Sequence, residues 1–158
     1  MLFLVATGFS LVACEKPAKT PTDATASASV PSHKAAEMPD TRLKLEQVDR
    51  GRLVYEQHCL RCHGVVGKGQ PGDWRVKGAN GMYPPPPLDD TAHAWHHSTA
   101  VLRQRILEGS PAGVGDMPAW QGKLTDAEID YVIVYIKSLW SPEVYRHWME
   151  IEMRSLQK

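Results

Sequence analysis

Two cysteines and a histidine carry the most specific chemistry in this 158-residue sequence. Cys59 and Cys62 stand three residues apart within the stretch EQHCLRCHG, and His63 follows the second cysteine directly. Such a stretch has four interpretations: a disulfide, half of a zinc site, a thioredoxin-like redox pair, or an attachment site for haem. The residues around the motif distinguish between them.

These surroundings favour haem. A zinc ribbon needs a second cysteine or histidine pair to complete four ligands, and the sequence has no second CxxC. A thioredoxin-like pair follows a strand, whereas the residues before Cys59 look helical. The residues on helical spacing are Leu45, Val48, Arg52 and Tyr55, with Leu53 alongside. Covalent haem needs two thiols for thioether bonds and an imidazole directly behind them to bind the iron. The order and spacing of the three residues therefore predict one covalently bound haem c.

The first 13 residues have the features of a signal peptide. Leu2 to Ala13 form an uncharged apolar run, typical of a signal-peptide core and too short for a comfortable membrane span. The run ends in LVAC, which resembles the bacterial lipobox and makes Cys14 the predicted lipidation site. No Lys or Arg follows Met1, although such signals normally begin with positive charge. An ordinary cleaved signal with a bystander cysteine is the alternative.

Composition predicts one domain behind a tether. Residues 14–40 are rich in Ala, Thr, Ser and Pro with almost no large apolar side chain, so we expect them to be disordered. The hydrophobic share of 42% suits a packed core, which we place in a domain over residues 41–140. The formal net charge is zero, which provides no basic field, and we expect no nucleic-acid partner.

Three further segments are expected to be helical. The stretch LTDAEIDYVIVYIKSLW begins with a capping box of Thr125 and Glu128 and continues with an apolar face at helical spacing. After Trp140, Ser141 as cap and Pro142 at the first helical position start an amphipathic extension over residues 141–158. We expect this extension to pack against its own domain, with docking to a partner as the alternative. The third segment follows Ser98 and ends at Gly109.

The region from about Leu45 to Trp140 resembles a class I cytochrome c, in particular the bacterial mono-haem domains of the cytochrome c oxidase subunit III type. In GRLVYEQHCLRCHG, Gly51 lies four residues before Tyr55 and the haem motif follows. Gly64, Gly67 and Gly69 match the glycine-rich turn after the motif, GVGDMPAW is similar to the distal-ligand segment, and LTDAEIDYVIVYIKSLW to the final helix. The resemblance implies an all-α class I cytochrome c fold, packed around one covalent haem c, with an extra carboxy-terminal helix.

The resemblance also implies roles for single residues. Met117 is the expected second axial ligand of the iron, opposite His63, and Pro118 biases it toward the extended backbone of a presenting loop. The final helix is expected to cross the first at Gly51. The carbonyl of Pro87 is the expected acceptor for the imidazole of His63, although the proline run also suits a plain stiff connector. The residues implied for the haem pocket and its surroundings are Tyr55, Trp74, Pro87, Leu88, Trp120 and Tyr135.

The stretch HAWHH leaves two interpretations open. His93, His96 and His97 have the i, i+3, i+4 spacing that brings side chains together on a helix, where they could bind a second metal. The other interpretation is a loop leading into the helix that Ser98 caps. The role of these histidines does not follow from the sequence.

A haem iron held by a histidine and a methionine has no open position, so the expected function is transfer of single electrons and not catalysis. We expect a protein that is not an enzyme, has redox proteins as partners and takes no small-molecule substrate. With Cys14 lipidated, it would be tethered on the periplasmic side of a bacterial membrane as a mobile carrier. The alternatives are a fixed haem c subunit of a larger oxidoreductase, or a sensor or enzyme that binds gas or peroxide after Met117 leaves the iron.

Overall fold

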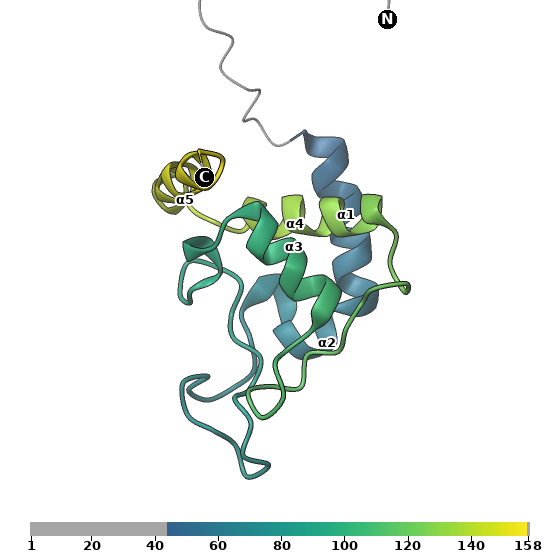
Figure 1. Cartoon of the computed structure of the whole chain (residues 1–158), viewed down its shortest axis with the longest axis vertical. Helices are drawn as coiled ribbons and strands as arrows, with labels where there is room; N and C mark the ends of the chain where they lie inside the picture. The colour runs from purple at the N-terminus through teal and green to yellow at the C-terminus, as the bar shows by residue number, and fades with distance from the viewer. Residues whose placement is uncertain (1–43, 158) are drawn as a thin grey trace, which may run out of the picture. The chain divides into compact units, whose positions relative to one another are not determined.

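The computed structural model describes residues 44–157, whose regular structure is helical. The helices are α1 (Leu45–His58), the single turn α2 (Leu60–His63), α3 (Thr99–Glu108), α4 (Asp126–Ser138) and α5 (Pro142–Ser155), with short turns η1 (Val65–Gly67) and η2 (Ala94–His96) (Figure 1). The expected all-α fold is confirmed. The predicted signal peptide (1–13), the tether (14–40) and Cys14 lie outside the described residues.

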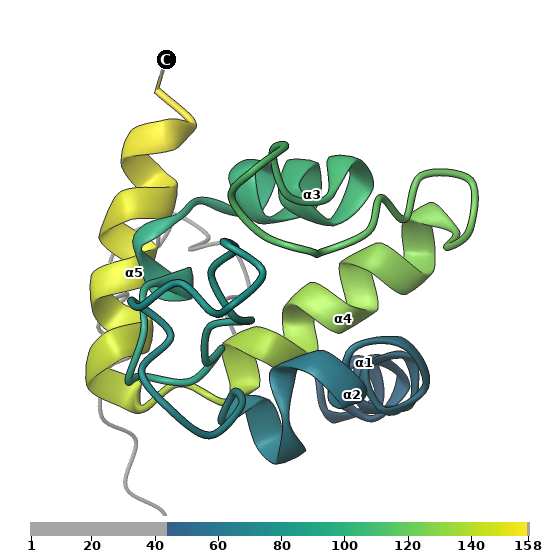
Figure 2. The same ribbon diagram turned by 90° about the horizontal axis from the view of Figure 1, so that it is seen from below.

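The core is built on a crossing of α1 and α4, seen in Figures 1 and 2. A side chain at Gly51 would place its Cβ 2.0 Å from the carbonyl oxygen of Tyr131 and 2.8 Å from Cβ of Tyr135. Only glycine fits such a backbone-to-backbone approach. The rings of Tyr55 and Tyr135 lie beside it with centroids 5.0 Å apart. The predicted crossing at Gly51, with Tyr135 against it, is confirmed.

The local signals for α4 are also confirmed. The backbone N–H of Glu128 donates to the hydroxyl of Thr125 at 3.2 Å, and the carboxylate of Glu128 accepts from the N–H of Thr125 at 2.8 Å. The predicted apolar face is buried in the core, because Ile129, Val132 and Ile133 are at most 1% exposed. The helix is thus fixed at its start by the capping box and along one side by burial.

The helix expected before Cys59 is confirmed as α1, and the crossing with α4 sets which of its residues are buried. Leu45 and Leu53 are 82% and 52% exposed, while the buried positions are Gly51, Val54 and Tyr55. Because the close approach at Gly51 sets the rotation of α1, the leucines turn outward. Helical spacing thus predicted the helix but did not show which of its residues would be buried.

Helix α5 packs against its own domain, beside η2 (Figure 2). Trp148 is only 4% exposed, and its indole N–H donates to the carbonyl of His97 at 3.1 Å. The carboxylate of Glu152 accepts from the N–H of Thr99 at the start of α3, at 2.7 Å. The expected packing of the extension is therefore confirmed, and its main apolar anchor is buried within the chain.

Candidate functional site

The two cysteines and the histidine lie on one turn that continues α1. Cys59 ends α1, with its N–H donating to the carbonyl of Tyr55 at 2.8 Å. The N–H groups of Cys62 and His63 then both donate to the carbonyl of Cys59, at 3.1 and 2.9 Å. The helical turn thus fixes the relative placement of both thiols and the imidazole.

Both thiols are free of disulfide bonds. Cys59 is partly buried and Cys62 is exposed. Burial, with a smaller contribution from Cys62, raises the pKa of Cys59 to about 11, so its thiol stays protonated near neutral pH. Two unpaired thiols at this spacing can each form a bond to the same external partner.

The imidazole of His63 is oriented by the proline run. Its Nδ1 lies 3.0 Å from the carbonyl oxygen of Pro86. A carbonyl only accepts hydrogen bonds, so Nδ1 carries the proton and Nε2 keeps its lone pair. Burial lowers the pKa of His63, and the hydrogen bond to the Pro86 carbonyl opposes this shift. The lowered pKa favours a neutral ring. A neutral imidazole with a free Nε2 is the form that binds metal.

The expected acceptor, Pro87, is wrong by one residue. Four consecutive prolines offer four carbonyls, and the fold directs that of Pro86 to His63. The ring of Pro87 instead packs closely against Gly69, because a Cβ added at Gly69 would lie 3.1 Å from the ring carbons of Pro87. The φ of +77° at Gly69 also disfavours a side chain there. The proline run therefore has both roles considered for it, an acceptor for the imidazole and a stiff connector.

Three hydrogen bonds attach the loop after His63 to its surroundings. The hydroxyl of Tyr55 donates to the carbonyl of Gly64 at 2.7 Å, which joins the loop to the buried face of α1. The N–H of Gly69 donates back to the carbonyl of His63 at 2.7 Å, and that of Leu88 donates to Gly67 at 2.6 Å. The motif and the proline run are thus joined in one framework.

Met117 lies on a segment that returns along the end of α3. The N–H of Ser110 donates to its carbonyl at 2.9 Å, and the N–H of Trp120 donates to the carbonyl of Ile106 at 3.1 Å. A Cβ at Gly109 would come within 2.5 Å of the carbonyl oxygen of Met117, so this glycine permits the close return. The side chain of Met117 packs half-buried against the core. Its coordination of iron stays a prediction.

The other expected pocket residues are distributed over several contacts. Tyr55 and Tyr135 meet at the helix crossing, and the carbonyl of Leu88 accepts from the indole N–H of Trp140 at 2.9 Å. Trp120 meets the ring of His58 edge-on, with centroids 5.1 Å apart. Trp74 stacks on the ring of His93 at 4.9 Å. Their contacts with a macrocycle likewise stay predictions.

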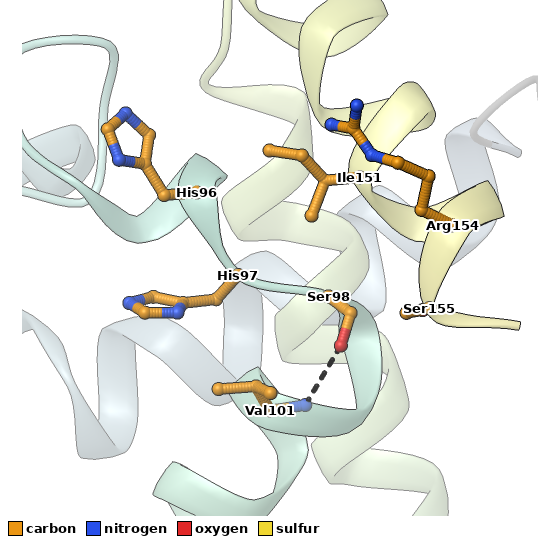
Figure 3. Close-up of a pocket in the computed structure, with 7 residues that line it drawn as sticks. All are labelled: His96, His97, Ser98, Val101, Ile151, Arg154 and Ser155. Atoms are coloured by element: carbon orange, nitrogen blue, oxygen red, sulfur yellow. Dashed lines mark hydrogen bonds between the residues drawn. The ribbon is translucent and has the colours of Figure 1, made fainter. Parts of the chain in front are cut away.

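The three histidines of HAWHH are not on one helix. His93 precedes the short turn η2 and His97 follows it, with their rings 5.6 Å apart and nearly perpendicular. Within residues 44–157, no cluster of histidine, cysteine and acidic side chains is suited to hold a metal ion. Ser98 caps α3, as expected, by accepting from the N–H of Val101 (Figure 3). The structure therefore favours the loop interpretation over a second metal site.

The donor set fits a covalently bound haem. Two free thiols on one turn match two thioether bonds, and a neutral imidazole with its Nδ1 proton held by a carbonyl matches an axial ligand. Cys59, Cys62 and His63 would hold the group from one side, with Met117 as the thioether donor from another segment. The sequence missed Pro86, because a run of identical residues does not show which carbonyl faces the imidazole.

Comparison with known proteins identifies the family. The model of the family "Cytochrome C oxidase, cbb3-type, subunit III" matches residues 46–136, which include the CxxCH turn, the Met117 segment and most of α1 and α4. The chain belongs to this family. The resemblance to a class I haem c domain is confirmed, and membership supports haem c as the cofactor.

The chain is also similar to subunits of cbb3-type oxidases from two bacteria. A cbb3-type cytochrome c oxidase subunit CcoP of Azospirillum sp. (strain B510) is 33% identical over 93 residues, covering 59% of this chain and 29% of the relative. A subunit FixP of Bradyrhizobium diazoefficiens is 34% identical over 90 residues, covering 57% of this chain and 27% of the relative. The chain thus spans less than a third of the length of either protein.

These relatives correct one expectation. The sequence predicted a protein that is not an enzyme, but the relatives are named as subunits of an oxidase, which is an enzyme complex. The prediction considered only whether this chain has an open catalytic site of its own, and not whether related chains are named as subunits of an enzyme. Within residues 44–157, no helix is long and apolar enough to cross a membrane.

Proposed function

We propose that this chain is a haem c subunit of a membrane-bound oxidase complex, passing single electrons at the periplasmic face. The observation that carries the proposal is the turn of Cys59, Cys62 and His63, with the imidazole oriented by the carbonyl of Pro86. The named relatives, subunits CcoP and FixP of cbb3-type oxidases, favour a fixed subunit over the mobile carrier expected from the sequence.

The residues of the site have separate tasks in this function. Cys59 and Cys62 would hold one haem c covalently, and His63 and Met117 would be the protein ligands of its iron. When bound, the haem supplies a reversible one-electron couple. Pro86 fixes the tautomer and rotation of His63, which increases the basicity of the ligand. Because His63 and Met117 would both ligate the iron, the protein would leave no coordination site for a substrate.

The framework around the turn suits electron transfer because it resists rearrangement. Tyr55 joins the motif loop to α1, and Leu88 joins the proline run to the same loop. Residues held by several hydrogen bonds to packed elements shift little when the charge nearby changes by one unit. We therefore expect little movement of the protein between the oxidised and reduced states.

Attachment to the membrane through Cys14 remains part of the proposal. Extraction of native membranes in mild detergent tests it together with the complex. We expect the haem-stained chain to migrate with an oxidase on a native gel and to show the mass of a lipid-modified amino terminus. A chain that migrates alone at all detergent concentrations would favour the mobile carrier, and release in salt without detergent would contradict the lipid anchor.

A further inference from the structure

The segment that leads to the expected methionine ligand is held from outside by a second loop. The N–H of Tyr83 donates to the carbonyl of Val114 at 2.9 Å, and Tyr83 pairs with Gly115 in an isolated β-bridge. The side-chain amide of Asn80 donates to the carboxylate of Asp116 at 3.0 Å. These contacts fall on three consecutive positions directly before the methionine. The second loop therefore restrains the backbone up to the expected ligand.

Asn80 is itself fixed in a turn. Its amide oxygen accepts from the N–H of Met82 at 3.0 Å, and the N–H of Gly78 donates to the carbonyl of Met82 at 2.9 Å. A carboxylate only accepts and a backbone N–H only donates, so the amide meets Asp116 with its nitrogen and Met82 with its oxygen. Neither a carboxylate nor an aliphatic side chain at position 80 can satisfy both partners.

The loop that carries Met117 needs restraint from its neighbours. It contains Gly113 and Gly115, which give its backbone wide conformational freedom. The N–H of Ser110 closes the base of the loop on the carbonyl of Met117 at 2.9 Å, while Asp116 is exposed. A methionine side chain has three rotatable bonds, so its sulfur is presented reliably only where the backbone is fixed. The contacts just before Met117 therefore decide how firmly its sulfur is held.

The second loop continues into the proline run that orients His63. Tyr83 directly precedes the four prolines, and the carbonyl oxygen of Pro86 lies 3.0 Å from Nδ1 of His63. Because proline rings fix φ, these few residues form a stiff link. One segment, residues 80–86, thus contacts the Met117 loop at its beginning and the His63 ring near its end.

We propose that Asn80 is a positioning residue for the methionine ligand, and that its bond to Asp116 keeps the sulfur of Met117 on the iron. The inference rests on the proposed function, which makes His63 and Met117 the ligands of a haem iron. Because Asn80 and Asp116 are exposed, their bond adds little to the stability of the whole fold. Local opening of the Met117 loop breaks far fewer contacts than unfolding, so the same bond has a larger share there. Its loss should free the iron for external ligands without unfolding the helices.

The test measures imidazole binding to the ferric, haem-loaded full chain, since imidazole binds only after the methionine leaves the iron. Asn80→Asp sets a carboxylate against Asp116 and should raise the affinity for imidazole about fivefold, the ratio expected for one lost hydrogen bond. The sulfur-to-iron absorption band should also disappear on warming well before the helical circular dichroism signal. In the double variant Asn80→Asp with Asp116→Asn, amide and carboxylate exchange places, and both readouts should return to the parent values.

Gln104→Glu is the matched control. The amide of Gln104 donates to the carboxylate of Glu108 at 3.1 Å on the exposed side of α3. The variant therefore makes the same change of charge and of contact, but within a helix and not in a segment that presents a ligand. It should change neither the imidazole affinity nor the temperature at which the band disappears.

Unchanged imidazole affinity in Asn80→Asp would overturn the inference, and so would an equal rise in Gln104→Glu. Loss of the band together with the helical signal would also contradict it, because Asn80 would then act only on the stability of the fold. If Asn80→Asp does not mature, Asp116→Ala is compared with Asp116→Asn, which keeps an acceptor for Asn80, and equal behaviour of the two contradicts the assignment. Failure of the proposed function is a different result, because the parent protein would then lack the haem or the band before any variant is made.

Discussion

The helix crossing and the loop framework are stabilised in different ways. Where α1 meets α4, apolar burial is continuous and Gly51 leaves no space for even a methyl group. From Gly64 to Ser98, short turns and the proline run depend on separate hydrogen bonds, such as those to the carbonyls of Gly64, Gly67 and Pro86. The difference suggests that the crossing sets the stability of the fold, whereas the loops set the properties of the cofactor.

The largest expected effect is functional and comes from a loop. In Met117→Ala the haem should stay attached through Cys59 and Cys62, but the midpoint potential should fall because thioether ligation favours the reduced iron. The reduced variant should also bind carbon monoxide, which the parent protein should not. Redox titration and difference spectra measure both changes.

The matched control for this prediction is Met153→Ala, on the exposed side of α5, which should leave potential and spectra unchanged. An unchanged potential in Met117→Ala would defeat the ligand assignment. A large loss of helical stability in the same variant would contradict the division between crossing and loops.

The crossing should show the largest effect on stability. Gly51→Ala forces a Cβ against the carbonyl of Tyr131, where neither backbone can move easily, and should reduce the free energy of unfolding by about 3 kcal/mol. Gly78→Ala in the loops is the control, since the nearest atom to its Cβ, in the side chain of Asn80, is 3.3 Å away. We expect a change within about 0.5 kcal/mol there. Equal losses in urea unfolding would remove the distinction between the two regions.

Lys137, buried between α3, α4 and α5, should make stability depend on pH. Its ammonium donates to the hydroxyl of Thr99 at 2.7 Å and lies 4.0 Å from the ring centroid of Trp148. Burial lowers the pKa of Lys137 to about 8 from an ordinary value of 10.5, against the opposing effects of Glu152 and Asp130. Between these two pH values the unfolded chain binds a proton that the folded chain has lost, so stability should rise with pH.

The expected gain from Lys137 is about 2 kcal/mol between pH 8 and 10, before tyrosine ionisation in the unfolded chain interferes. Lys137→Met should flatten this rise, and Lys123→Met, at an exposed position, should not. Denaturant unfolding at several pH values measures the slope. A parent protein whose stability is constant or falls over this range would show that Lys137 is not desolvated by α5.

The smallest expected effect comes from the hydrogen bond that joins the two regions. Tyr55→Phe keeps the ring at the crossing but removes the bond to the carbonyl of Gly64, and should cost about 1 kcal/mol. Tyr83 is 41% exposed, so Tyr83→Phe should cost less than half as much. Thermal unfolding followed by circular dichroism compares them. No difference between the two variants would mean that the link between α1 and the motif loop adds nothing to stability.

The sequence predicted the features that depend on neighbouring residues. The capping box of Thr125 and Glu128, the caps at Ser98 and Ser141, and the CxxCH turn follow from short-range spacing, and the structure has each of them. The features that depend on how distant segments meet were not predictable. The exposure of Leu53 follows from the rotation of α1 at the crossing, and the choice of Pro86 over Pro87 from how the loops meet.

Trp95 shows the same limit at the level of a single side chain. The sequence around a tryptophan between histidines does not show whether its indole N–H will find a hydrogen-bond partner in the folded protein. The lack of one became visible only when the surrounding residues were placed and its Nε1 atom was found buried without an acceptor among them. The signal peptide, the tether and the lipidation site at Cys14 lie within residues 1–43, outside the described residues, and remain predictions from the sequence alone.

The central claim is that this polypeptide holds haem covalently through Cys59 and Cys62. It is tested most directly by the alkaline pyridine haemochrome spectrum of the denatured, exported protein, run beside the variant with both cysteines changed to alanine. We expect the parent chain to give the band position of two thioether bonds and to keep its colour on a denaturing gel, and the variant to lose both. Haem that extracts into acidic acetone from the parent protein, or a colourless parent protein, would contradict the account.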